Sequence, residues 1–240
     1  MAITSERGLI DFHCHILPGM DDGAQTPAAS LELLRQAAEQ GVLAMVCTPH
    51  YYPEETVGCF LERRREALRQ MTEAADREKL SLPRLILGAE VAYYPGILKN
   101  VELERLCIGD TRYMLLELPF EPWAPFVLRE IYELTLTRDI IPVIAHLERY
   151  RRLQKKSVLT QLMEMGFPVQ ANSSFLLDNR TARRAKRLVR SGQIHLLGSD
   201  CHDPISRPQT LGAAFRQLNS WGMGERAEEI LALGRRILKL

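Results

Sequence analysis

Seven short apolar runs, alternating with longer amphipathic stretches, constrain the fold of this chain most strongly. Each run consists of about 4 to 8 mostly apolar or β-branched residues bounded by turn formers, which is typical of a buried strand. The runs are LIDFHCH, VLAMVCTPH, RLILGAEV, YMLLELPF, IIPVIAHLER, FPVQANSS and IHLLGSDCH. Strands that alternate with helices predict a parallel sheet that is covered by helices or closed on itself. Seven such units favour an α/β barrel.

The stretch after the first run shows the expected helix pattern. Leu31 and Leu34 recur at helical spacing in TPAASLELLRQAAEQG. Thr26 fits the start of this helix and Gly41 fits its end. A second helical stretch contains the basic cluster 63–65 between two glutamates, and we interpret this cluster as a solvated face.

Length and composition exclude several classes of protein. A chain of 240 residues without a Pro- or Gly-rich linker suits one domain over residues 1–240. With 31 basic and 30 acidic residues, the net charge of +1 gives no overall attraction to nucleic acid or an anionic membrane. We expect a cytoplasmic protein, because no signal peptide or membrane span is recognisable. The 5 cysteines form no C-x-x-C pair, which favours reduced thiols.

Residues that can bind metal ions follow the predicted strands. Because the carboxyl ends of parallel strands converge on one mouth of a barrel, we expect these side chains to lie together. They are His13 and His15, His50, Glu90, Glu117, His146, and Asp200 and His202. Five of the 6 histidines belong to this set, whereas His195 precedes the last strand and is predicted to be structural.

The spacing within this set favours metal binding. His13 and His15 are two residues apart, so on a strand both imidazoles point to the same side. Asp200 and His202 repeat this spacing at the last strand. A carboxylate that follows an apolar strand, such as Glu90, is rarely buried unless it is paired or binds a metal.

The number of candidate ligands exceeds what one ion needs. Adding Asp22 from the GMDDG segment gives nine imidazole and carboxylate groups, whereas a tetrahedral zinc site takes about four. Nitrogen and oxygen ligands without thiolate suit manganese, iron or zinc. Neighbouring metal ions at a barrel mouth favour hydrolysis, and phosphate esters are the leading substrate class.

These segments together resemble the polymerase and histidinol phosphatase (PHP) superfamily. The resemblance rests on IDFHCHILPGMDDG, CTPHYYPE, LGAEVAYY, LLELPF, AHLERY and GSDCH, in order from residue 10 to about residue 207. Within the superfamily, the chain is most similar to the bacterial manganese-dependent protein-tyrosine phosphatases of capsule and exopolysaccharide operons. The resemblance implies a distorted seven-stranded β/α (TIM-like) barrel in a single domain.

The resemblance also implies a role for each candidate ligand. The first of about three ions, most readily Mn²⁺ with iron or zinc as alternatives, is held by His13, His15, Glu90 and Asp200. Glu90 bridges to a second ion held by Glu117 and His146, and a third ion is held by Asp22, His50 and His202. Arg149 and Arg207 match phosphate-binding arginines and would act in catalysis, while a metal-bound hydroxide would attack phosphorus directly.

The implied substrate is the phosphotyrosine tail of a bacterial tyrosine kinase that regulates capsular or exopolysaccharide synthesis. We expect neither nucleic-acid binding nor membrane insertion, and the composition leaves homo-oligomer formation open. One alternative is a small-molecule phosphomonoesterase such as a histidinol-phosphate phosphatase. A second alternative is a non-catalytic metal-binding PHP module.

A cysteine-dependent phosphatase is a further rival, because Cys-x5-Arg spacing occurs twice. Cys59 to Arg65 lies in a charged helical stretch without glycine, which cannot form a cradle of backbone N–H groups. Cys201 to Arg207 contains a proline and lies among the candidate metal ligands. The sequence therefore disfavours a thiolate nucleophile.

Overall fold

Short parallel strands form the centre of the molecule. The computed structural model describes residues 8–240. The predicted domain range 1–240 and the N-terminal segment in which no signal peptide is predicted both begin outside these residues. Within residues 8–240 the strands are β1 (Leu9–Cys14), β2 (Val42–Cys47), β3 (His50–Tyr51), β4 (Arg84–Leu87), β5 (Glu90–Ala92), β6 (Tyr113–Glu117), β7 (Ile141–Ile144), β8 (Gln170–Asn172) and β9 (Leu196–Gly198). They pair in parallel in the orders β1-β2-β4, β3-β5-β6-β7 and β8-β9.

Each of the seven apolar runs contains a strand, but two runs are interrupted. The second run is divided into β2 and β3 at Thr48 and Pro49, and the third into β4 and β5 at Gly88 and Ala89. Proline has no N–H for a ladder and glycine weakens a strand. The three sheets of the described chain are joined only by isolated bridges such as Cys14 to Cys201. A single closed barrel of seven strands is therefore not confirmed, whereas the α/β class with parallel sheets is.

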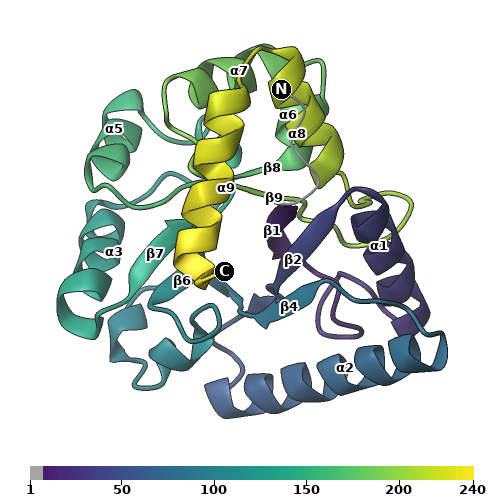
Figure 1. Ribbon diagram of the computed structural model, residues 1–240. Helices are drawn as coiled ribbons and strands as arrows, with labels where there is room; N and C mark the ends of the chain where they lie inside the picture. Colours follow the sequence, from purple (N-terminus) through teal and green to yellow (C-terminus); the bar gives the residue numbers. More distant parts are fainter. Residues whose placement is uncertain (1–7) are drawn as a thin grey trace.

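Helices surround these strands (Figure 1). The α-helices of the described residues are α1 (Pro27–Glu39), α2 (Val57–Arg77), α3 (Pro125–Arg138), α4 (Leu147–Tyr150), α5 (Lys156–Glu164), α6 (Ser173–Leu177), α7 (Ala182–Arg190), α8 (Leu211–Ser220) and α9 (Gly224–Leu238). Two 3₁₀ helices, η1 (Ile97–Lys99) and η2 (Leu103–Leu106), precede β6. The predicted start of α1 is confirmed, because the Thr26 side chain accepts a hydrogen bond from the Ala29 N–H. None of the helices in residues 8–240 has the length and apolar character needed to cross a bilayer.

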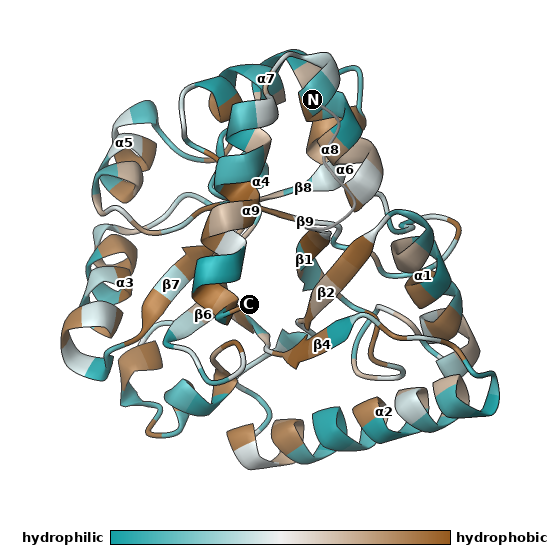
Figure 2. Ribbon diagram, in the orientation of Figure 1, coloured by the Kyte–Doolittle hydropathy of each residue, from teal (hydrophilic) through white to brown (hydrophobic). Residues whose placement is uncertain are grey.

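Strands β2 and β7 are mostly apolar, as Figure 2 shows. The larger cluster of buried side chains lies between the strands and the surrounding helices. A smaller cluster joins β1 residues Ile10 and Phe12 to Ile237 and Leu238 of α9. The C-terminal helix therefore packs against the sheet residues that lead to the first histidine pair, and it fixes their position.

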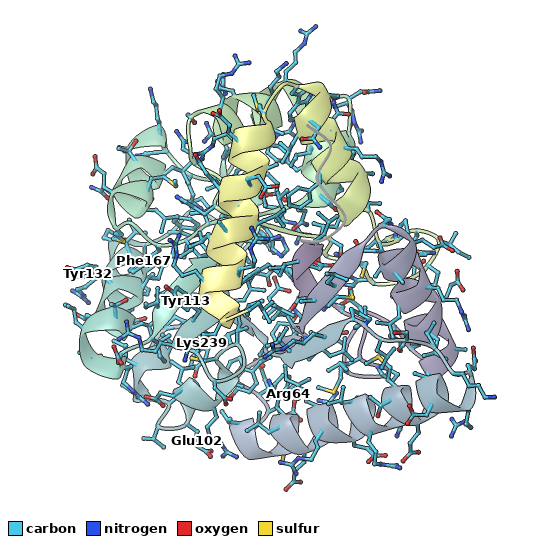
Figure 3. All side chains as sticks on the ribbon, in the orientation of Figure 1. Arg64, Glu102, Tyr113, Tyr132, Phe167 and Lys239 are labelled. Atoms are coloured by element: carbon cyan, nitrogen blue, oxygen red, sulfur yellow. The ribbon has the colours of Figure 1, made fainter. Side chains whose placement is uncertain are left out.

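The prediction that the basic cluster 63–65 is a solvated face is confirmed for Arg63 and Arg65, which are exposed, and is wrong for Arg64. The guanidinium of Arg64 is not solvated: its Nη1 donates to the Gly88 carbonyl at 2.5 Å, and it lies 5.5 Å from the centre of the Phe60 ring. In Figure 3, the labelled Arg64 lies where α2 meets the strands. A long side chain can bury its stem while its charged end satisfies a backbone carbonyl, so the basic cluster supplies one link between α2 and the end of β4.

Candidate metal centre

The carboxyl ends of the strands bring all nine predicted ligands into one region. His13, His50, Glu90 and Glu117 lie within β1, β3, β5 and β6, and the others directly follow β1, β7 or β9 except Asp22. Asp22 comes from the loop before α1. Their donor atoms form overlapping groups, within each of which all atoms lie within 4.8 Å of one another. The groups are His13, His15 and Asp200; His13, Glu90 and His146; His50, Glu90 and Glu117; and His15, Asp22, His50 and His202.

The first part of the centre is fully enclosed. His13 Nε2 lies 2.9 Å from His15 Nε2 and 3.1 Å from Glu90 Oε2. Asp200 Oδ1 lies 3.4 Å from His15 Nε2. These four side chains are buried, so their polar atoms converge without bulk water to solvate them.

Glu90 joins this part to a second. Its other oxygen, Oε1, lies 2.6 Å from His146 Nε2, which is 3.5 Å from Glu117 Oε1. A carboxylate that presents one oxygen to each of two ligand groups has the arrangement required to bridge two cations. Glu90 can therefore serve both parts of the centre.

The third part opens to solvent. Asp22 Oδ1 lies 3.3 Å from His202 Nε2 and 3.6 Å from His50 Nε2. The Asp22 side chain is 67% exposed, whereas His202 is 3% exposed. An adjoining cavity of about 860 Å³ is lined by Asp22, His50 and Tyr52, among others. A ligand can thus approach the centre from this side.

Several buried atoms of the centre are arranged in a way that suits metal coordination better than hydrogen bonding. Among residues 8–240, His50 Nδ1, Asp200 Oδ1 and His202 Nε2 find no hydrogen-bond partner, although such atoms are normally satisfied. The two Nε2 atoms of His13 and His15 face each other at 2.9 Å, and two protonated rings would repel. His146 and Asp200 also adopt left-handed backbone conformations, with φ of 50° and 54°. Such strained backbone conformations are found at functional sites. A cation bound by nitrogen and oxygen would satisfy the side-chain atoms that lack a hydrogen-bond partner.

Residues that sequence reasoning missed orient the ligands. Asp21, rather than its neighbour Asp22, accepts hydrogen bonds through Oδ2 from the His50 N–H and at His15 Nδ1, both at 2.8 Å. On β8, Asn172 Oδ1 lies 2.9 Å from His146 Nδ1. A hydrogen bond to the second ring nitrogen fixes which nitrogen faces a metal. The signal for Asn172 was present, because Gln170 and Asn172 repeat at strand eight the two-residue spacing of the histidine pairs.

A second supporting network ties β1 to β9. The buried carboxylate of Asp11 accepts hydrogen bonds from the N–H groups of His13 and Ser199, the Ser199 hydroxyl and the Gln209 amide. Burial raises the pKa of Asp11, and these hydrogen bonds oppose that rise. The network therefore aligns the strands that carry the two paired ligand motifs.

The electrostatics of the centre are those of a crowded set of charges. Burial and the charge of Glu90 raise the pKa of Glu117 to about 7. Burial and the charge of His15 lower the pKa of His202 to about 4. Both shifts favour the neutral form, which is the expected response of titratable groups that are buried close to one another.

Arg149 and Arg207 lie at the edge of the centre. An Nη2 atom of each donates to the same oxygen, Asp200 Oδ2, at 2.9 Å. Their side chains are 37% and 39% exposed. The guanidinium of Arg149 also lies 5.6 Å from the centre of the Phe120 ring. Two partly exposed cations can therefore meet an anion that enters the mouth.

The segment from Cys201 to Arg207 does not form an anion cradle. The Asp203 carboxylate accepts hydrogen bonds from the N–H groups of Ile205, Ser206 and Arg207, so these donors are already used. Cys201 is fully buried, and Cys59 lies exposed on α2 without a surrounding loop. The geometry agrees with the sequence-based rejection of a cysteine nucleophile. Within the described residues His195 belongs to none of the four candidate ligand groups, and its Nδ1 accepts a hydrogen bond from the Val169 N–H.

The fold and the site together define a class: α/β proteins that gather imidazoles and carboxylates, which could hold metal ions, at the carboxyl ends of parallel strands. Comparison with known protein families agrees with this class and identifies one family within it. The family described as "Capsular polysaccharide synthesis, CpsB/CapC" matches residues 9–235, and the chain belongs to this family.

Relatives with known names support the assignment. The tyrosine-protein phosphatase YwqE of Bacillus subtilis is 34% identical over 208 residues, which cover 83% of this chain and 79% of that protein. The putative tyrosine-protein phosphatase CapC of Staphylococcus aureus is 30% identical, with 96% and 91% covered. A solved structure from a study of YwqE and Streptococcus pneumoniae CpsB, described as metal-dependent tyrosine phosphatases, superposes with a TM-score of 0.84 at 30% identity, with 96% and 94% covered. A Lactococcus lactis histidinol phosphate phosphatase gives a TM-score of 0.55 at 12% identity, with 92% and 94% covered, and shares the fold.

Proposed function

We propose that this chain is a metal-dependent phosphatase that hydrolyses phosphotyrosine in proteins. The observation that carries the proposal is the juxtaposition of orphaned buried ligand atoms and two arginines that share one carboxylate oxygen. Membership of a family whose named relatives are tyrosine-protein phosphatases supports the same reaction. Residues 1–240 would act as one catalytic domain in the cytoplasm.

The proposed ligand sets follow the three parts of the centre. His13, His15, Glu90 and Asp200 would hold one ion; Glu90, Glu117 and His146 a second; and Asp22, His50 and His202 a third. Imidazole and carboxylate ligands suit Mn²⁺, which we propose as the resident ion, and they also suit iron or zinc. Bound ions of this kind supply an activated water near neutral pH and neutralise charge on phosphoryl oxygens.

Arg149 and Arg207 would bind the phosphoryl group. In the described structure both guanidinium groups donate to Asp200 Oδ2, the same carboxylate that is a proposed ligand. Guanidinium groups present planar donor pairs that match phosphate oxygens, and their charge stabilises the transition state of phosphoryl transfer. Each guanidinium has five N–H donors, so both arginines have further donors to offer to the substrate beyond the one that reaches Asp200.

Aromatic side chains at the mouth favour an aryl phosphate over an alkyl phosphate. The ring of Tyr52, which is 49% exposed, stacks on His50 with centroids 5.5 Å apart. On the side of Arg149, Phe120 is 47% exposed. A tyrosyl ring can pack against such faces, and tyrosyl oxygen, with a pKa of about 10, leaves more readily than an alkoxide.

The cavity beside the third ligand set is open enough for a peptide. It has a volume of about 860 Å³ and is lined by Tyr52, His50, Asp22 and residues at the start of α2. We infer that the natural substrate is the phosphorylated tail of a tyrosine kinase that regulates capsular or exopolysaccharide synthesis. The histidinol-phosphate phosphatase in the comparisons shares the fold alone at 12% identity, which does not favour its substrate here.

The test is a substrate panel with manganese and with chelator: a phosphotyrosine peptide, a phosphoserine peptide and histidinol phosphate. We expect the phosphotyrosine peptide to have the highest kcat/KM, and no turnover after chelation. Arg149→Lys and Arg207→Lys should each lower kcat/KM by roughly 10- to 1,000-fold, because lysine loses the planar donor pair. The matched control Arg216→Lys, on the exposed face of α8, should leave kcat/KM unchanged. Faster hydrolysis of histidinol phosphate would overturn the proposed substrate class.

A further inference from the structure

A concentration of positive charge lies outside the metal centre. The segment 151–156 and helix α7 (Ala182–Arg190) together contain nine Lys and Arg residues and no Asp or Glu. The net charge of the whole chain is only +1, so the rest of the chain is net negative. We call the exposed side of these two segments the basic surface.

Within the described part of the chain, the cations of the basic surface have no acidic partners. Among residues 8–240, no Asp or Glu forms an ion pair with any of the nine, although Arg69 and Arg138 elsewhere each pair with glutamate. Helix α7 buries Ala185, Leu188 and Val189 against the core, which leaves its cations on the outer side. Figure 3 shows nitrogen-tipped side chains that project outward at the top of the molecule, where α7 lies. Uncompensated charge of one sign attracts a ligand of the opposite sign.

The basic surface continues to the mouth of the metal centre. Arg149 contacts Asp200 in the centre, and Arg151 follows two residues later. Burial and the charges of Arg187 and Arg184 lower the pKa of Arg151, because these α7 side chains lie close to it. Arg151 is thus two residues from the proposed phosphate-binding arginine and within electrostatic reach of the cations on α7.

We propose that the basic surface binds an acidic segment of the protein substrate, next to the phosphotyrosine that occupies the metal centre. This inference rests on the proposed function, because the substrate must be a polypeptide that extends beyond its phosphotyrosine. Carboxylates or further phosphates on the segment would pair with the guanidinium and ammonium groups. Such contacts select among substrates without touching the reacting atoms.

An acidic peptide fits the basic surface better than a membrane or a nucleic acid does. The apolar side of α7 is buried in the core, so it is not free to insert into a lipid interface. Segments 151–156 and 182–190 contain no Phe, Tyr or Trp, and the neighbouring Trp221 ring is already engaged by Lys186, whose Nζ lies 5.8 Å from its centre. Continuity with Arg149 instead points to a ligand that is already engaged at the mouth.

The experiment compares two phosphotyrosine peptides with the same core, one with an acidic flank and one with a neutral flank, and para-nitrophenyl phosphate as a substrate without a flank. We expect the wild-type protein to prefer the acidic peptide by a roughly tenfold lower KM, a preference that high salt removes. Arg184→Glu with Arg187→Glu should abolish this preference and leave turnover of para-nitrophenyl phosphate unchanged. Arg184→Lys with Arg187→Lys should retain it.

The matched control is Arg65→Glu with Arg77→Glu on the exposed side of α2, which changes the net charge equally and should retain the preference. Circular dichroism checks that each variant folds. The inference is overturned if both double glutamate variants lose the preference for the acidic peptide equally, or if the wild type shows no such preference. It is also overturned if the protein binds anionic vesicles or RNA more tightly than the acidic peptide, with the same dependence on Arg184 and Arg187. Fluorescence anisotropy of the labelled acidic peptide tests the basic surface even if no peptide is hydrolysed. Binding without hydrolysis would count against the proposed function alone.

Discussion

Replacement of Asp21 by asparagine should weaken the metal centre without removing a proposed ligand. Asp21 Oδ2 lies 2.8 Å from His15 Nδ1 and accepts from the His50 N–H at the same distance. Oδ1 accepts from the Gly23 N–H at 2.9 Å. An amide can replace only part of this pattern, because its nitrogen is a donor that meets the His50 N–H or the Gly23 N–H. The orientation of two imidazoles would therefore be lost.

The pKa of Asp21 gives the size of the effect on stability. Burial opposes its ionisation, but the hydrogen bond and charge of His15 lower the pKa to about 2 from an ordinary value of 3.8. This difference corresponds to about 2 kcal/mol. Because the pKa is lowered in the folded protein, the stabilisation is complete above pH ~4 and is lost as the pH falls from there toward 2.

Urea unfolding and metal titration measure these effects. In chelator-treated protein at pH 7, Asp21→Asn should lower the free energy of unfolding by about 2 kcal/mol, and this difference should shrink as the pH falls toward 2. Loss of an orienting partner should also weaken metal affinity by roughly 10- to 100-fold. The control Asp110→Asn changes an exposed carboxylate and should alter neither quantity. Unchanged metal affinity in Asp21→Asn would refute the orienting role.

Three further substitutions test the site and the strands that hold it. Cys201→Ser should keep most of the activity on phosphotyrosine, since the thiol is buried and has no role in the proposed reaction; complete loss of activity with metal still bound would restore the cysteine mechanism. Gly198→Ala should lower the free energy of unfolding by about 1 to 3 kcal/mol in urea titrations, because a Cβ there would lie 2.4 Å from His13 Cβ. Gly58→Ala should cost far less, because an added Cβ there would meet no atom of the described residues within 4 Å other than those of its own helix and chain neighbours; equal losses would contradict the packing at His13. Tyr52→Ala should lower kcat/KM for phosphotyrosine by a factor that is roughly ten times the factor for phosphoserine. Tyr132→Ala, which removes a ring of similar exposure from α3, should change neither value.

Sequence reasoning located the strands well, because each has a distinctive apolar run. It could not predict the interruptions in the second and third runs, where Pro49 and Gly88 lie within otherwise continuous patterns. Such breaks depend on how neighbouring strands pair, and this long-range pairing decides whether sheets join into a closed barrel. The α/β class was therefore predictable, and the division into three sheets was not.

The candidate ligands were predictable for a different reason. Histidine and carboxylate side chains directly after apolar strands are rare, and the paired spacing of His13 with His15 indicated a shared direction. Asp21 and Asn172 were missed because aspartate and asparagine are common in loops and turns. Arg64 was misjudged, since one residue of a charged helix can turn inward when a backbone carbonyl accepts from it.

Metal dependence tests the central claim most directly. Chelator-treated protein should be titrated with Mn²⁺ while bound metal is counted and the rate on a phosphotyrosine peptide is followed. We predict no turnover without metal, and activity that rises together with occupancy toward about three ions per chain. Phosphotyrosine hydrolysis at an undiminished rate in the metal-free protein would contradict the account.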